Sequence, residues 1–262
     1  MKEKKSHVIP LIIIILLVGL GLTYYIRTTR LNEPLPQTNS TLANKIDNQK
    51  EKETAISETI EIKNKNVVGS YPAITGESLV ALDARADVQN FVREFQEQAD
   101  AELPELRSEF PDTYSDQTYG FDVKADYYSS NATRSIVLQK YIFTGGANGS
   151  AFYTTFNESN NGGRITLNDL ITAEKRDSFV TMVKKRLMNY SVPGIGTVSL
   201  FPESIADIEF ENLTRFAVDN DDMILYFDEY EVGAGAVGTV SITIDGYKDL
   251  ISNLAVNEND KR

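Results

Sequence analysis

The chain has 262 residues, a formal net charge of −12, no cysteine, no tryptophan and a single histidine, His7. Without cysteine no disulfide can form. Everything after residue 7 must also work without imidazole and thiolate, which excludes Ser-His-Asp and Cys-His nucleophile pairs and the usual zinc sites there. Strong acidity argues against nucleic acid as a partner, because phosphate binding requires a basic surface. We therefore expect an ordinary hydrophobic core, no cofactor and no metal site.

Charge is divided unevenly along the chain. Residues 1–30 sum to +4, and the remaining 232 residues sum to −16. Such asymmetry indicates that two parts of the chain occupy different environments.

Residues 8–26 contain no charged side chain. As a helix they would extend about 28 Å, close to the thickness of the hydrocarbon core of a bilayer. Three lysines precede the segment, so the positive-inside rule predicts a cytoplasmic tail at 1–7 and a single-pass cell-membrane protein with its C-terminal part outside. A cleaved signal peptide is the alternative, but the apolar run continues past the small residues Gly19 and Gly21 to Ile26.

Residues 27–57 are rich in Asn, Thr, Gln, Glu and Lys. This composition cannot bury enough apolar surface to fold, so it predicts a flexible linker. A polar tail is expected at 255–262. The folded part is therefore expected between these two polar segments.

The first half of the folded part begins with alternating apolar residues at 58–68, which predict a strand, followed by a turn or short extended piece at 70–74. Apolar residues at three- and four-residue steps predict a helix over 83–103, with Pro104 marking its end. Three β-rich runs separated by glycine- and asparagine-containing turns then predict an antiparallel meander. They are 119–129, 134–144 and 150–157.

The second half is predicted to contain a helix at 173–190 and a short closing helix near 246–254. Between them lie three further β-rich runs, at 213–218, 223–231 and 239–244. Blocks of strands with segregated helices indicate an α+β fold with antiparallel sheets rather than a βαβ repeat.

Two motifs are similar to ligand-binding sequences. Residues 233–238 read G-x-G-x-x-G, but the β-branched run 239–244 predicts a strand where a dinucleotide site needs a helix, so we interpret the glycines as a strand connection. Asn157, Ser159 and Asn161 resemble the opening of a calcium loop. Its twelfth position is Asn168 rather than glutamate, which favours a hairpin turn.

Charged clusters offer two further hypotheses. The acidic residues of 219–231 include Asp228, Glu229 and Glu231, and paired carboxylates can hydrolyse glycosides without histidine. A solvated turn and strand face is the alternative. Five cations on the helix at 173–190 could contact an anionic wall polymer, or simply form a solvated helix face.

Three stretches together resemble a bacterial envelope domain family. Residues 141–149, YIFTGGANG, are similar to its tyrosine-rich TGGAHG strand-turn. Residues 163–170, GRITLNDL, resemble its G-x-x-L-x-L-x-D-L-F segment, and 226–232, YFDEYEV, followed by Gly238, resemble its Y-F-x-x-Y-E-I…G strand. The family is the extracytoplasmic domain pair of unknown function found in RsiV-type anti-sigma factors and beside the catalytic domain of PdaC-type peptidoglycan deacetylases.

The resemblance implies two small α+β subdomains, a PdaC-like one at 58–149 and an RsiV-like one at 150–254. Within these motifs we predict a binding site at the glycine turn and the neighbouring tyrosine-glutamate strand; the alternative is that both are strand ends with obligatory turns. The site residues would be Tyr141, Thr144, Gly145, Gly146, Asn148, Tyr230 and Glu231. No catalytic residue is assigned.

Asn148 stands where the family turn carries histidine, so the predicted exterior domain has no imidazole. We therefore expect a non-enzymatic, membrane-anchored binding or sensing domain. RsiV-like proteins bind lysozyme, so the resemblance implies a lysozyme-like cationic protein or cell-wall glycan as partner, with the lipid bilayer contacted through 8–26. The competing hypothesis is a cell-wall glycan hydrolase or deacetylase-associated enzyme that uses the carboxylates.

Overall fold

The computed structural model describes residues 56–192 and 196–248. The predicted membrane segment 8–26, the polar tail and most of the closing helix near 246–254 lie outside these residues. Within the described ranges, no helix is both long and apolar enough to cross a membrane.

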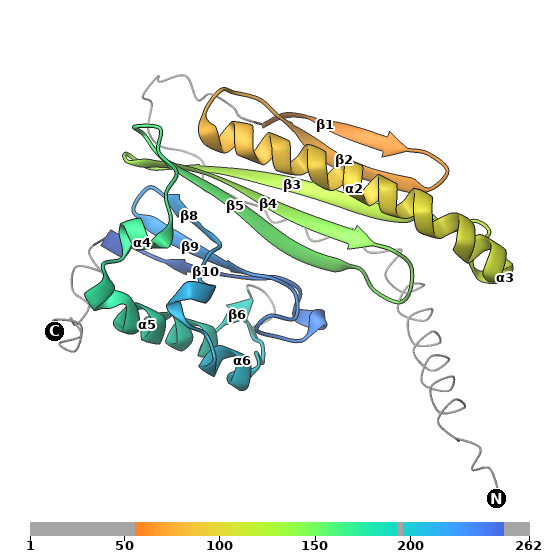
Figure 1. Ribbon diagram of the computed structural model, residues 1–262. Helices are drawn as coiled ribbons and strands as arrows, with labels where there is room; N and C mark the ends of the chain where they lie inside the picture. The colour runs from red at the N-terminus through yellow and green to blue at the C-terminus, as the bar shows by residue number, and fades with distance from the viewer. Residues whose placement is uncertain (1–55, 193–195, 249–262) are drawn as a thin grey trace, which may run out of the picture. The chain divides into compact units, whose positions relative to one another are not determined.

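The larger sheet has five strands in the order β1-β2-β3-β4-β5 (Figure 1). All neighbours are antiparallel except β2 and β3, which are parallel and are joined through a long helix. The strands are β1 (Ile56–Lys63), β2 (Val67–Ile74), β3 (Tyr119–Ser129), β4 (Thr133–Phe143) and β5 (Ser150–Ser159). The sheet thus continues through β5, beyond residue 149, and takes in residues from both predicted subdomains.

Helix α2 (Leu79–Glu109) lies along one face of this sheet (Figure 1). Its buried stripe, which includes Val88, Val92 and Phe95, packs against inward-facing residues of β3 and β4. The helix was predicted to stop at Pro104, which is wrong, because it continues for another turn. Arg107 explains the extension, since its guanidinium donates hydrogen bonds to the Asn66 side chain at 2.7 Å and the Gln117 carbonyl at 2.8 Å.

The smaller sheet has the order β10-β9-β8 and packs on the opposite face of the larger one. Its strands are β8 (Phe216–Asp219), β9 (Asp222–Phe227) and β10 (Val240–Ile244). Helix α5 (Arg176–Met188) buries Phe179, Val183 and Leu187 at four-residue steps into a second core under this sheet. The layers therefore run helix, sheet, sheet, helix (Figure 1).

The remaining elements are short. They are α3 (Pro111–Tyr114), α4 (Leu167–Leu170), η1 (Ala173–Lys175), β6 (Ser191–Val192), β7 (Gly196–Thr197), α6 (Pro202–Ala206), η2 (Phe210–Asn212) and η3 (Gly235–Val237).

The α+β class with mainly antiparallel pairing is confirmed, but two predicted strands change. The single strand over 58–68 is divided into a hairpin, because the Asn64 side chain accepts the backbone N–H groups of Asn66 and Val67 and closes a turn there. The strand predicted over 223–231 ends at Phe227. Glu229 and Glu231 therefore do not share the face of a strand.

Candidate functional site

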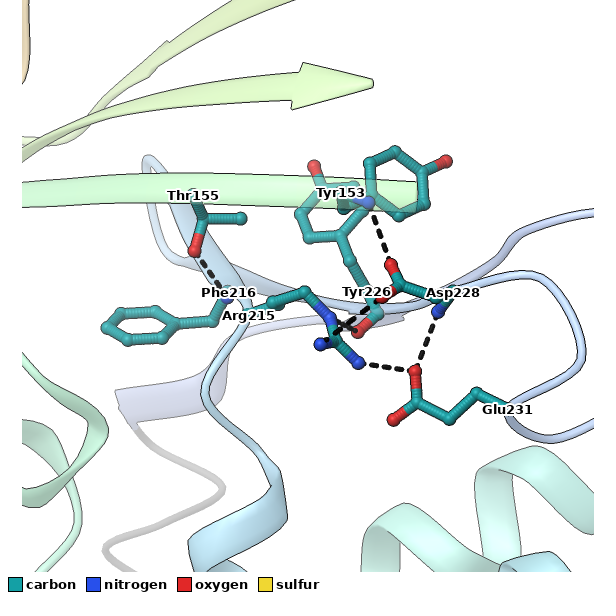
Figure 2. A network of polar contacts seen from close by, with 7 residues as sticks. All are labelled: Tyr153, Thr155, Arg215, Phe216, Tyr226, Asp228 and Glu231. Carbon is teal, nitrogen blue, oxygen red and sulfur yellow. Dashed lines mark hydrogen bonds and ion pairs between the residues drawn. The ribbon is translucent and has the colours of Figure 1, made fainter. Parts of the chain in front are cut away.

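An arginine holds two of the predicted acidic residues together. Arg215, just before β8, pairs with the carboxylate of Asp228 at 3.4 Å through Nη1 and with that of Glu231 through Nη2 (Figure 2). Glu231 also accepts the backbone N–H of Asp228 at 2.7 Å. The side chains are 24–31% exposed, so this is a partly desolvated network in which each carboxylate has a partner.

The same segment covers the edge of the larger sheet. β5 is an edge strand, and its outer backbone groups need partners or protection. Asp228 accepts the N–H of Tyr153 at 2.7 Å (Figure 2), and Glu229 accepts the N–H of Ala151 at 2.9 Å and donates its own N–H to the Ala151 carbonyl at 3.1 Å. Asp228 and Glu229, two of the three carboxylates considered for catalysis, therefore hold the segment that follows β9 against β5.

The tyrosines of the two predicted motifs are both exposed, Tyr141 by 43% and Tyr230 by 55%. Each ring lies on a glycine: a Cβ on Gly149 would come within 2.4 Å of the Tyr141 ring, and one on Gly235 within 2.3 Å of the Tyr230 ring. Only glycine permits such close approach of a ring to the backbone. Tyr230 also has a φ of 67°, which a bulky residue rarely adopts.

Ala151 connects the two motifs. It faces Tyr141 across the β4–β5 ladder, and its other edge bonds to Glu229, the residue before Tyr230. The structure therefore brings Tyr141 and the Tyr230–Glu231 segment to the same end of β5, as the predicted site requires. One of its members, Glu231, is turned toward Arg215.

The glycine turn itself follows β4. Gly145 and Gly146 have φ values of 96° and 92°, in the region that favours glycine, whereas Thr144 is half-buried and Asn148 is exposed. The glycines thus have a conformational role that requires no ligand.

The G-x-G-x-x-G motif also has a structural explanation. It is followed by strand β10, as predicted, and not by a helix of the kind that binds pyrophosphate. A Cβ on Gly233 would lie 2.8 Å from Leu200, Gly235 carries the Tyr230 ring, and Gly238 has a φ of 73°. Each glycine is therefore required by packing or by backbone geometry.

Asn157, the first residue of the calcium-loop resemblance, is oriented inward. Its Oδ1 accepts a hydrogen bond from Ser135 at 2.6 Å and its Nδ2 donates to the Phe216 carbonyl at 2.9 Å, which ties the two sheets together. The residues after it form the predicted turn, in which the N–H of Gly162 bonds to the Ser159 carbonyl at 2.8 Å. In the described ranges, no cluster of three or more His, Cys, Asp or Glu residues could hold a metal.

Several cations of the second helix contact the protein itself. Lys184 donates to the Ala206 carbonyl at 2.5 Å, Arg176 lies 4.8 Å from the centre of the Phe210 ring, and Arg186 is 3.8 Å from Asp245.

Arg215 is the residue of this network that sequence patterns did not predict. It is the only basic residue between Arg186 and Lys248, a stretch with eleven acidic side chains. A solitary cation in such a stretch is a recognisable signal, because partly buried carboxylates need a partner.

Comparison with known proteins finds similarity to a domain of unknown function. Residues 168–246 match the model of a family described as "Protein of unknown function (DUF3298)". Over 188 residues, the chain is 29% identical to the peptidoglycan-N-acetylmuramic acid deacetylase PdaC of Bacillus subtilis strain 168. The PdaC match covers 70% of this chain and 38% of PdaC, so the chain spans less than two thirds of that protein. Together the two matches confirm the resemblance to a PdaC-type domain of unknown function.

Two solved structures of DUF3298 family proteins are also similar. The protein from Bacteroides fragilis NCTC 9343 has 16% identity and a TM-score of 0.47, covering 78% of this chain and 95% of that protein. The protein from Pseudomonas aeruginosa PAO1 has 14% identity and a TM-score of 0.41, covering 77% and 95%.

Proposed function

We propose that this chain is a membrane-anchored extracytoplasmic domain of the bacterial cell envelope that works by binding or sensing and not by catalysis. One observation carries the proposal: Asp228 and Glu231, which could serve histidine-free chemistry, both face Arg215. Glycoside hydrolysis instead needs two carboxyl groups directed at the sugar from opposite sides. Similarity to a peptidoglycan deacetylase supports the envelope setting, and residues 8–26 would supply the anchor.

The binding surface of this proposal centres on Tyr141 and Tyr230. Exposed tyrosines offer a large ring with only two side-chain torsions to fix on binding, and tyrosine is common among residues that dominate interface energies. The formal charge of −16 after residue 30 would attract a cationic protein over about a Debye length, roughly 8 Å at physiological salt. A lysozyme-like cationic protein is therefore the favoured partner, with cell-wall glycan as the second candidate.

The test measures binding of lysozyme and of purified peptidoglycan to the full chain in lipid nanodiscs. We expect saturable, salt-sensitive lysozyme binding that weakens at least about tenfold, or about 1.4 kcal/mol, when Tyr141 and Tyr230 are both changed to alanine. Phe110→Ala is the matched control, because Phe110 is similarly exposed, by 49%, but lies at the end of α2. Equal loss in the control would contradict the proposed surface.

An enzymatic function makes a different prediction. Release of sugar or acetate from peptidoglycan by the chain, abolished in a folded Glu231→Gln variant, would overturn a binding-only function. Circular dichroism of the variant separates loss of activity from loss of fold, since Glu231 also holds Arg215.

A further inference from the structure

A cavity of about 490 Å³ opens beside the middle of β5, on the side where α4 and the start of β8 approach it. Its floor is apolar and belongs to the hydrophobic cores, since Leu167, Leu213 and Phe216 are 2–5% exposed. Ile165 and Phe210 complete the apolar lining. Both the volume and this lining are typical of sites that bind small ligands. None of the site residues predicted from the sequence contributes to it.

Backbone pairing along the outer edge of β5 is interrupted at Thr155, for which no outer backbone hydrogen bond is found among the described residues, although its hydroxyl accepts the backbone N–H of Phe216 at 3.3 Å (Figure 2). Tyr153 donates its outer N–H to Asp228, and Asn157 accepts the N–H of Ile165 on its outer carbonyl at 2.9 Å. In an antiparallel ladder every second residue directs its backbone groups outward, so Thr155 is the outward-facing residue between them. Thr155 and Asn157 line the cavity, which therefore borders the interval of the strand where backbone pairing is interrupted.

The mouth carries an ion pair. Arg164 donates two hydrogen bonds of 2.7 Å to Asp83, through Nε and Nη2, while its side chain remains 68% exposed. Because Asp83 already neutralises the charge of Arg164, the guanidinium offers a ligand hydrogen-bond donors rather than a free positive charge. Glu211, also on the lining, makes no ion pair in the described part of the chain and would repel an anion.

Polar side chains alternate with the apolar ones around the opening. Thr155, Asn168 and Thr214 all line it, and the side chains of Asn168 and Thr214 form no hydrogen bond within the described residues. A hydrocarbon chain would desolvate such groups without replacing their hydrogen bonds, which costs free energy. Peptide amides can pair with them.

From these observations we infer that the cavity binds a short, uncharged peptide segment that places an apolar side chain on the Leu167–Leu213–Phe216 floor. Its backbone amides would bond along the Thr155 edge of β5 and to the polar groups at the mouth, with a carbonyl accepting from Arg164. An extended peptide added to an exposed strand edge is an established mode of peptide recognition. This site goes beyond the proposed function and shares no residue with the Tyr141–Tyr230 surface.

Absence of cysteine allows a site-specific readout. We would label Asn212→Cys, at an exposed residue between Glu211 and Leu213 of the lining, with an environment-sensitive fluorophore in the full chain in nanodiscs. Thr243→Cys, on the exposed face of β10, is the matched control. The probe is N-acetyl-leucyl-phenylalanine amide. We expect a saturable fluorescence change at position 212 and none at position 243. Either no saturable change at 212 or the same change at 243 would overturn the inference.

Two ligand controls define the chemistry. The same dipeptide with a free carboxylate should bind more weakly because of Glu211, and sodium decanoate should give no saturable change. Saturation with decanoate but not with the capped peptide would overturn the inference in favour of a lipid-like ligand. Tighter binding of the free acid would overturn the assignment of an uncharged ligand.

Two variants test the location. Thr214→Trp, a change at an exposed residue, should fill the mouth and abolish saturation, and Arg164→Met should weaken binding because the donors at the mouth are lost. Unchanged peptide affinity in both folded variants would contradict this site. Lysozyme binding through Tyr141 and Tyr230 can be measured on the same variants, so failure of either idea is seen separately.

Discussion

The carboxylate of Glu158, which is only 1% exposed, accepts the backbone N–H of Val80 at 3.2 Å. The bond joins β5 to the first turn of α2, 78 residues earlier in the chain. A carboxylate at this end of a helix interacts favourably with the helix dipole and satisfies a donor that has no partner within the helix. Arg134 pairs with the other oxygen of Glu158 at 3.2 Å.

Removing this carboxylate should destabilise the fold. Glu158→Ala leaves the buried N–H of Val80 without its partner, so we expect a loss of about 1–3 kcal/mol in the free energy of unfolding, measured with urea. Glu158→Gln, which retains an acceptor, should lose less. Glu105→Ala, at an exposed position of the same helix, is the control and should change stability by no more than about 0.5 kcal/mol. Equal effects at both positions would refute the capping role.

Two glycines distinguish core packing from surface packing. A Cβ added to Gly69 would lie 2.4 Å from the Phe121 ring, and a Cβ added to Gly235 would lie 2.3 Å from the Tyr230 ring. Phe121 is 4% exposed and cannot move freely, whereas the Tyr230 ring is 55% exposed. We expect Gly69→Ala to cost about 1–3 kcal/mol, and Gly235→Ala clearly less while displacing the ring. Thermal unfolding measures the first effect, and NMR shifts of Tyr230 measure the second; a larger loss at Gly235 would contradict this explanation.

Arg215 should resist conservative replacement. Arg215→Met leaves two partly desolvated carboxylates without their cation, so a loss of about 1–3 kcal/mol is expected. Arg215→Lys should recover only part of it, because one ammonium cannot reproduce the arginine's separate contacts to Asp228 and Glu231. Arg93→Met is the control, since Arg93 is 56% exposed and its pairs are on the surface. A full rescue by lysine would show that net charge alone matters.

The Asp83–Arg164 pair should appear in the pH dependence of stability. The hydrogen bonds from Arg164 lower the pKa of Asp83 below its ordinary value of 3.8. A carboxyl whose pKa is lowered by folding contributes stability above its unfolded pKa and loses it as the pH falls through the folded pKa. The stability difference between the parent and Asp83→Asn should therefore be constant at neutral pH and shrink below about pH 4. Asp116→Asn, at an exposed turn, is the control, and a difference that grows on acidification would contradict the sign.

Sequence periodicity predicted much of the local structure, and the failures have physical causes. The meander of β3, β4 and β5 followed from alternating residues and glycine turns, which are local signals. The extension of α2 beyond Pro104 depends on hydrogen bonds from Arg107 to Asn66 and Gln117. Asn66 is distant in the sequence and Gln117 lies outside any regular pattern, so periodicity does not reveal these contacts. The early end of β9 at Phe227 reflects Asp228 and Glu229 bonding to β5 in preference to continuing their own ladder.

Composition alone determined which chemistry is closed to the residues after His7, because without cysteine or a further histidine they cannot supply a thiolate or an imidazole in any fold. The order of residues in the sequence also located the glycine turn and the tyrosine-glutamate motif. Only the tertiary structure decided what the acidic residues do, since the role of a carboxylate depends on the groups it faces. Arg215 and the edge of β5 occupy Asp228, Glu229 and Glu231, and leave Tyr141 and Tyr230 exposed.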